Sequence, residues 1–385
     1  MSGWAQVPWL ALLAVPLGLL LFGRPLRLDR RRPVARPPAR PAVHVVVPAR
    51  NEEDVLGLLL DDLRRLDPAP ASVTVVDDHS TDATRHVAAS FPGVQVLAAP
   101  PLPSRWAGKN WASQTGADHA TAEADEDELL LFLDADVRLT PDALGQIVDA
   151  RSERGGVLSV QPFHVVPTPV EQLSGFFNLA SMMGIGAGTR RPTGLFGPLL
   201  CWRVGDYRRL GGHRRVRCEL VEDLALARAL REDGIPSAVM CGGEVVRFRM
   251  YPHGMGSVLE GWTKNLAAGV GSTPLHRSVG VALWMAGTLS AALHLVQSIG
   301  EPPGRIVSAL LLYAATALVI GVMLHRVGSY RWWSAVGFPV LGLFFTGIFV
   351  RSAWRTYVRR AVRWKGRTLD PRGVVEPPEA EGAAT

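Results

Sequence analysis

The sequence contains few cysteines and no arrangement of them that would hold a metal. Its 385 residues include three cysteines, Cys201, Cys218 and Cys241, without the close pairing of structural metal sites. The odd number and the lack of a pattern indicate free thiols in a reducing compartment. Aromatic residues are also scarce, at 7% of the chain, and no stripe of them alternates with basic residues in its middle. This absence argues against an RNA or DNA partner, because single-stranded nucleic acids are bound by grooves that combine both residue types.

Charged residues make up only 20% of the chain, and the basic ones are unevenly distributed. Hydrophobic residues reach 48%, and they are concentrated in residues 4–22 and after residue 279. Arginine-rich blocks at residues 24–40 and 351–367 each adjoin one of these apolar stretches. This placement fits anionic lipid headgroups, so the composition indicates a membrane protein with a folded central part.

Residues 4–22 are long enough to cross a bilayer as a helix, which needs about 20 residues. No basic residue precedes this stretch and no small-residue cleavage site follows it, which favours a retained anchor over a signal peptide. We therefore expect a transmembrane anchor at residues 1–23, followed by a stiff linker rich in proline and arginine at residues 24–42. Because arginines follow the anchor, the chain from residue 24 onward is expected in the cytoplasm.

Three further apolar segments, residues 279–299, 306–324 and 333–350, are candidate spans in a C-terminal membrane region at residues 278–350. A basic tail follows at residues 351–385, and its end has the composition of a disordered segment. Three spans would leave this tail outside the cell, whereas the positive-inside rule favours the cytoplasm. The third segment is the shortest and contains glycine and proline, so we expect it to be re-entrant or to lie flat. The prediction is a multi-pass plasma-membrane protein with one N-terminal and two to three C-terminal transmembrane helices.

The central part of the chain, residues 43–250, is predicted to be a cytoplasmic α/β domain. Three stretches rich in apolar and β-branched residues alternate with two helical patterns: strands at residues 43–47, 73–76 and 94–97, and helices at residues 54–66 and 82–90. This alternation predicts a mostly parallel sheet. Polar residues follow the first two strands, where ligands bind in open α/β sheets.

An apolar run at residues 129–133 ends in two carboxylates, Asp134 and Asp136. A buried strand reads as such a run, so both carboxylates are expected at the carboxyl edge of the sheet. Two hard oxygen donors beside a crevice suit Mg²⁺ or Mn²⁺, which takes further ligands from water and a diphosphate. The alternative is a surface turn with two solvated aspartates.

Two other polar groups are predicted at the same edge. Lys109 follows a glycine at the start of a helix expected at residues 110–122, where free N–H groups and the helix dipole favour a phosphate. Glu222 and Asp223 begin a helix expected at residues 222–232, and charge compensation of its dipole is the alternative interpretation.

Two apolar segments follow a different pattern. Residues 169–188 carry few charges and fit the headgroup plane, an apolar acceptor site or a core helix. Residues 251–277 include an amphipathic helix with Trp262 and Lys264, which fits the bilayer interface.

Five short motifs, in this order, resemble those of the inverting glycosyltransferases of family two, which have the so-called A fold: PARNEE at residues 48–53, DDHSTD at 77–82, GK at 108–109, DAD at 134–136 and ED at 222–223. The resemblance covers residues 43–265. The chain is more closely similar to a membrane-bound branch that glycosylates the carotenoid acid 4,4'-diaponeurosporenoate, and to hopanoid-associated relatives. That likeness rests on four longer motifs: WAGKNWA at 106–112, FGPLLCW at 196–202, YRRLGGH at 207–213 and YPHGMGSVLEGWTKNLAAG at 251–269. Residues 261–265 depart from the Q-x-x-R-W of many relatives, which favours transfer of one sugar to a lipid over polymer synthesis.

The resemblance implies transfer of a hexose, glucose by default, from a UDP-sugar to a lipid acceptor such as a carotenoid acid. It implies that the nucleotide site contains Pro48, Ala49, Glu52 and Asp78. It also implies that Lys109 contacts the diphosphate or the uracil, and that Asp134 approaches the ribose.

The resemblance assigns chemical roles to the remaining residues. Asp136 would bind Mg²⁺ or Mn²⁺ on the diphosphate, with His253 as a further metal ligand. Asp223 would be the general base, next to Glu222 in the substrate site. Trp262 and Lys264 would lie near the diphosphate or the acceptor mouth.

Other functions share parts of this pattern. Within glycosyltransferases, the acceptor could be a hopanoid, a sterol or diacylglycerol, or a water-soluble molecule if the anchors only localise the enzyme. Outside them, a nucleotidyltransferase would use the same fold but release pyrophosphate, and an inactive membrane scaffold would not bind a nucleotide.

Overall fold

The computed structural model describes residues 8–28, 40–189, 191–219, 221–269, 273–354, 362–364 and 367–369. The middle of the predicted linker and most of the predicted basic tail, including its end, lie outside the described residues. Within the tail, Val362–Trp364 (β12) and Arg367–Leu369 (β13) form an antiparallel pair.

An eight-stranded sheet organises the domain, in the order β1-β10-β7-β9-β5-β2-β3-β4. Its strands are β1 (Leu26–Arg27), β2 (Val43–Ala49), β3 (Ser72–Asp77), β4 (Val94–Ala98), β5 (Leu129–Leu133), β7 (Val157–Gln161), β9 (Leu199–Arg203) and β10 (Ser237–Cys241). Among the described pairs of this sheet, only β9 runs antiparallel, against both β5 and β7. The predicted mostly parallel sheet is therefore confirmed. One correction concerns the linker, because β1 pairs with β10 and so belongs to the sheet.

The strands form where the sequence is continuously apolar. All five residues of β5 and all five of β7 are buried, as expected for strands covered on both faces. The covering helices are α2 (Leu56–Arg64), α3 (Thr84–Ala89), α4 (Gly108–Ala120), α5 (Ala143–Arg154), α8 (Val204–Leu210) and α9 (Glu222–Glu232), with a 3₁₀ helix η2 (Gly212–Val216). Helix α4 packs closely on the sheet, since a Cβ on Gly116 would lie 2.5 Å from a Val46 methyl.

The parallel register brings several loops to one edge. Ala49 at the end of β2 pairs with Asp77 at the end of β3, and β5 lies on the other side of β2. The chain leaves all three strands in the same direction. A small second sheet lies beside this edge: β6 (Val137–Leu139), β11 (Val246–Phe248) and β8 (Phe163–His164).

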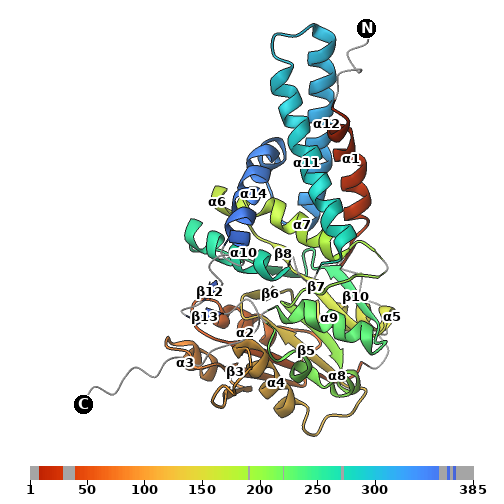
Figure 1. Ribbon diagram of the computed structural model, residues 1–385. Helices are drawn as coiled ribbons and strands as arrows, with labels where there is room; N and C mark the ends of the chain where they lie inside the picture. Colours follow the sequence, from red (N-terminus) through yellow and green to blue (C-terminus); the bar gives the residue numbers. More distant parts are fainter. Residues whose placement is uncertain are drawn as a thin grey trace, which may run out of the picture.

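Long apolar helices extend away from the sheet (Figure 1). In the described part of the chain, α11 (Leu275–Gln297) and α12 (Pro303–Val327) are the two helices long and apolar enough to cross a membrane. Helix α1 (Trp9–Phe22) packs against both. Within the predicted span at residues 4–22, the described helix has 14 residues, and residues 1–7 lie outside the described part.

The third predicted C-terminal span is not one continuous helix. It is divided at Gly337 into α13 (Trp332–Val336) and α14 (Phe338–Trp354). Helix α14 has 17 residues, fewer than α11 or α12, and its orientation in a bilayer stays a prediction.

Two buried elements connect the sheet to these helices. The segment predicted at residues 169–188 forms α6 (Pro169–Gln172) and α7 (Gly175–Ile185), and α7 packs against α1, α11, α12 and α14. Helix α10 (Met255–Gly269) covers the amphipathic segment and packs against α14. Nine of the eleven residues of α7 are buried, so most of this helix fits the core-helix interpretation of residues 169–188.

Candidate active site

A cleft of about 1180 Å³ opens where the loops after β2, β3 and β5 meet. Eleven of the twelve residues predicted from the sequence line it: Pro48, Ala49, Glu52, Asp78, Lys109, Asp134, Asp136, Glu222, Asp223, His253 and Trp262. Lys264 lies in α10, but its side chain is outside the described part of the structure. The fold thus gathers residues that are up to 214 positions apart, from Pro48 to Trp262, around one cavity.

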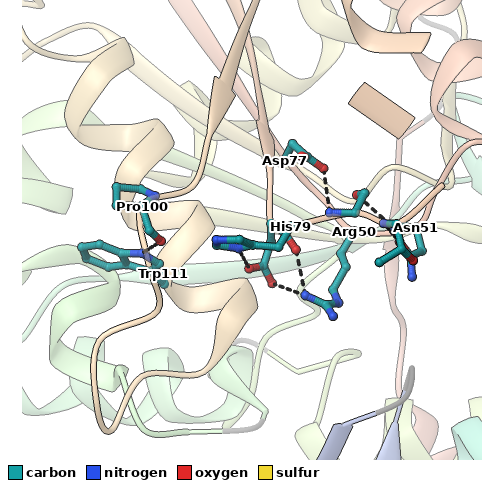
Figure 2. Close-up of polar contacts among 9 residues, drawn as sticks. Arg50, Asn51, Asp77, His79, Pro100 and Trp111 are labelled. Carbon is teal, nitrogen blue, oxygen red and sulfur yellow. Dashed lines mark hydrogen bonds and ion pairs between the residues drawn. The ribbon is translucent and has the colours of Figure 1, made fainter. Parts of the chain in front are cut away.

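The loops after β2 and β3 hold each other in place at one end of the cleft (Figure 2). The Asp78 side chain is almost fully buried, and its backbone N–H donates to the Ala49 carbonyl at 2.8 Å. Arg50 Nη1 donates to the Asp78 carbonyl at 2.8 Å, and His79 Nδ1 lies 3.3 Å from Asp78 Oδ1. Asn51 N–H donates to the Ser80 hydroxyl at 3.1 Å. Arg50 stands inside the PARNEE motif, but no role was predicted for it from the sequence.

Lys109 joins three elements in the middle of the cleft. It lies in the first turn of α4, and its Nζ is 2.8 Å from Asp134 Oδ1 after β5 and 2.8 Å from Glu222 Oε1 on α9. Burial opposes its charge, but the two carboxylates raise the pKa of Lys109 above its usual value. The side chain remains 39% exposed to the cleft. Lys109 is therefore a permanent cation that can still reach a ligand.

The loop before α4 is anchored as well. Trp111 Nε1 donates to the Pro100 carbonyl at 2.9 Å (Figure 2). The Trp111 ring also meets Trp106 edge-on at 4.9 Å. These contacts fix the entry of the chain into the helix that carries Lys109.

The two carboxylates that begin α9 have different pKa values. Burial and the neighbouring Glu222 raise the pKa of Asp223 to about 7. Burial would also raise the pKa of Glu222, but the Lys109 ammonium holds it below its usual range. Two neighbouring carboxyl groups whose pKa values are pushed apart are typical of acid–base sites. Glu222 is thus suited to stay ionised beside Lys109, and Asp223 to accept a proton near neutral pH.

Asp223 is held by backbone groups. Its Oδ2 accepts from the Gly197 N–H at 3.0 Å, and its Oδ1 accepts from the Leu224 N–H at 2.8 Å. Ser159 on β7 fixes the segment before Gly197, because its hydroxyl accepts from Phe196 N–H at 2.7 Å and donates to Phe196 O at 3.0 Å. The carboxylate orientation is therefore set by two rigid elements.

Gly197 is a site residue that the sequence analysis did not assign. A Cβ there would lie 3.1 Å from Glu222 Oε1, 3.5 Å from Asp223 Oδ2 and 3.5 Å from Lys109 Nζ. A glycine allows this close approach. Its position inside the FGPLLCW motif was the available signal.

Asp136 lies in a concentration of negative charge. Burial raises the pKa of Asp136 to about 7, and the carboxylates of Asp134 and Glu52 add to the rise. In the described part of the chain no basic side chain forms an ion pair with Asp136. The same part holds no cluster of three or more histidine, cysteine, aspartate or glutamate side chains that could enclose a metal. The exposed His253 is therefore not part of such a ligand cluster in the structure. This donor set fits Mg²⁺ or Mn²⁺, which needs only one or two carboxylates when water and phosphates supply the rest.

Trp262 is fixed within the protein. Its Nε1–H donates to the Ser174 hydroxyl at 3.1 Å, and its ring stacks on Phe177 at 4.6 Å and meets Tyr251 edge-on at 5.7 Å. Because the indole N–H is used in this way, Trp262 contributes ring atoms to the cleft wall. A tertiary contact of this kind leaves no signal in the sequence.

The far wall of the cleft is apolar and belongs to α7, α11 and α14. Its residues include Phe177, Ile185, Met285, Leu289, Phe345 and Phe349. The cleft therefore has a carboxylate-rich end at the sheet and an apolar end among the long helices.

Comparisons with known proteins agree with this geometry. Residues 44–174 match the family described as glycosyl transferase family 2. A 4,4'-diaponeurosporenoate glycosyltransferase of Staphylococcus aureus (strain USA300) is 33% identical over 334 residues, which cover 85% of this chain and 88% of that protein. The protein of the same name from strain MRSA252 has the same identity and coverage. A mannosyltransferase, PcManGT from Pyrobaculum calidifontis in complex with GDP-Man and Mn²⁺, is 18% identical with a TM-score of 0.54, over 90% of this chain and 99% of that one.

The solved structure supports the fold alone, and it agrees with the predicted A fold. The identity to the Staphylococcus aureus proteins extends over most of both chains, so it reaches beyond the residues that match the family. The nucleotidyltransferase and scaffold alternatives are set aside by these relatives. The chain belongs to glycosyl transferase family 2 and is a glycosyltransferase of the A fold, with two described helices that are long and apolar enough to cross a membrane.

Proposed function

We propose that this glycosyltransferase moves a hexose, with inversion, from a UDP-sugar to a membrane lipid, with UDP-glucose and a carotenoid-type carboxylic acid as the first candidates. One observation carries the proposal: a single cleft has carboxylates and a fixed lysine at one end and the walls of long apolar helices at the other. The 4,4'-diaponeurosporenoate glycosyltransferases named above support this choice of acceptor.

The donor end suits a nucleoside diphosphate sugar. Asp78 and Arg50 would hold the nucleoside, and Pro48, Ala49 and Glu52 would line its pocket. Asp136, with Asp134 nearby, would hold Mg²⁺ or Mn²⁺, which neutralises charge on the departing diphosphate when bound. PcManGT in complex with GDP-Man and Mn²⁺ supports this assignment of a divalent metal.

Lys109 would supply the second positive charge at the diphosphate. Its Nζ is held by Asp134 and Glu222, so little reorganisation is needed as the leaving group becomes more negative. Preorganised charge of this kind is usually the largest contribution to catalysis. Glu222 would thus act by positioning Lys109.

Asp223 would serve as the general base. The acceptor oxygen attacks the anomeric carbon while the bond from that carbon to the diphosphate oxygen breaks, and UDP leaves from the opposite face. If the acceptor is an alcohol, its proton passes to Asp223, whose pKa of about 7 suits this task. A carboxylic acid acceptor is already ionised at neutral pH and has no proton to give.

The membrane helices support a lipid acceptor and a plasma-membrane location. A cytoplasmic domain at residues 43–250, an interfacial region at 251–277 and a membrane region at 278–350 would place the cleft at the bilayer surface. Hopanoid, sterol and diacylglycerol acceptors share the apolar requirement, so the product has to separate them.

Product analysis tests the proposal. Purified protein in lipid vesicles is given UDP-glucose, Mg²⁺ or Mn²⁺ and a panel of acceptors: a carotenoid carboxylic acid, a hopanoid, a sterol, diacylglycerol and a water-soluble sugar. We expect UDP release and a carotenoid ester heavier by one hexose in the mass spectrum. Transfer only to the water-soluble sugar, or release of pyrophosphate, would overturn the proposal.

A further inference from the structure

The apolar end of the cleft follows one face of α11. The residues that line it there are Val281, Ala282, Met285, Ala286 and Leu289. Residues at these spacings lie on one side of an α-helix. The facing wall belongs to α14, through Phe345, Thr346 and Phe349. We call this space the α11–α14 groove, and none of these eight lining residues is charged.

The groove has a closed end. The lining residues on α11 extend from Ser278 to Leu289, a rise of about 16 Å at 1.5 Å per residue. At Leu289 the two helices touch, because a Cβ on Gly342 of α14 would lie 3.1 Å from Leu289 Cδ2. The hydrocarbon core of a bilayer is about 30 Å thick, so the groove is about as deep as one leaflet.

The groove is also open along one side. Ala282 and Ala286 are exposed although they line the cavity, and Phe349 is 38% exposed. Thr346 is exposed beside Phe349, whereas Phe345 closes the inner wall. A chain could therefore enter sideways, between the helices, without passing through water.

The catalytic end restricts what can occupy the groove. The same cavity contains Asp223, so a molecule in the groove presents its reactive oxygen there and extends its remaining length along α11. Small side chains at Ala282 and Ala286 leave room that larger residues would fill. An uncharged groove with one open side fits a single elongated apolar chain.

We propose that the α11–α14 groove holds the apolar body of the acceptor, a single elongated chain that enters laterally from one leaflet, and that the small side chains of Ala282 and Ala286 leave the room that this chain occupies. This inference rests on the proposed function, because it describes how that acceptor reaches Asp223. The experiment must therefore distinguish a wrong assignment of the groove from a wrong assignment of the function.

The test compares two straight-chain carboxylic acids in the vesicle assay, one too short to pass Ala282 and one long enough to reach Leu289. Ala286→Phe and, separately, Ala282→Phe should lower transfer to the long acid at least about tenfold, since a filled cavity excludes its former occupant. Transfer to the short acid should fall much less than transfer to the long acid, and UDP-dependent thermal stabilisation should persist. The control is Ala315→Phe on α12, which is exposed and does not line the cleft, and it should match the wild type with both acids.

Each outcome has a defined meaning. An unchanged ratio of long-acid to short-acid transfer in both variants would refute the proposal that the α11–α14 groove holds the acceptor. Retained thermal stabilisation by UDP would show that the variants are folded. Efficient transfer to diacylglycerol that is equally sensitive to Ala286→Phe would overturn the single-chain assignment. If wild-type protein transfers sugar to no apolar acceptor, the proposed function itself fails.

Discussion

Asp223→Asn separates an alcohol acceptor from a carboxylic acid acceptor. The substitution keeps the size of the side chain and removes the proton acceptor, while one amide oxygen can still accept from the Gly197 or Leu224 N–H. With an alcohol, the loss of a general base should lower the rate by about 10²–10⁴-fold. With a carboxylic acid, which is ionised at neutral pH, the loss should stay below about a hundredfold because no proton has to be removed.

The pH dependence follows from the same group. Because the pKa of Asp223 is about 7, the base is protonated below neutral pH and kcat/KM with an alcohol should fall as the pH is lowered through that value. Above it, the rate should reach a plateau. The carboxylic acid should lack this dependence on Asp223.

The assay measures initial UDP release with an alcohol and an acid that share one apolar chain, across the neutral pH range. Asp233→Asn is the matched control, because Asp233 lies at the end of α9, is exposed and does not line the cleft. Equal losses with both acceptors in Asp223→Asn, or a loss below about tenfold with the alcohol, would refute the general-base assignment.

Three further predictions concern the same cluster. Lys109→Met should lower kcat/KM by about 10²–10³-fold, since it removes a preorganised charge. It should also move the pH profile with the alcohol to higher pH, because Lys109 lowers the pKa of Asp223. A profile that does not move would contradict this coupling. Gly197→Ala should lower kcat by about tenfold or less, because its Cβ would lie 3.1 Å from Glu222 Oε1 and shift that side chain slightly, and UDP-dependent thermal stabilisation should persist. An unchanged kcat would contradict this prediction. Asp223→Asn should raise Tm at about pH 8 and leave it unchanged at about pH 4. The reason is that the pKa of Asp223 is raised in the folded state, so its ionisation destabilises the fold as the pH rises through 7. Equal Tm values for the variant and the wild type at both pH values, measured by scanning calorimetry, would refute this.

The sequence predicts the donor end of the cleft because its signals are local. The apolar run before Asp134 indicates a buried strand, and β5 covers Leu129–Leu133 as expected. Parallel strands share one carboxyl edge, so the loops with Asp78 and Asp136 had to meet. The start of α9 at Glu222 also agrees with the predicted helix at residues 222–232.

The details that depend on tertiary packing were not predicted. Nothing local indicates that Lys109 bridges Asp134 and Glu222, or that Gly197 supports Asp223. The hydrophobic pattern marks α11 as apolar, but it does not reveal which face borders a cavity. The indole N–H of Trp262 binds Ser174, a partner 88 residues away.

The membrane segments show the same division. Hydrophobicity alone identifies α11 and α12, which depend on composition and length. Hydrophobicity does not give the helix boundary at Gly337 or the start of α1 at Trp9. Their arrangement in a bilayer remains a prediction.

The most direct test of the central claim, that distant acidic loops form one metal-dependent donor site, is calorimetric titration of UDP with and without Mn²⁺. We expect UDP binding that strengthens with Mn²⁺ in the wild type and in Asp233→Asn, and a loss of that enhancement in Asp136→Ala. UDP binding that is equally strong without Mn²⁺, or is unchanged in Asp136→Ala, would contradict it.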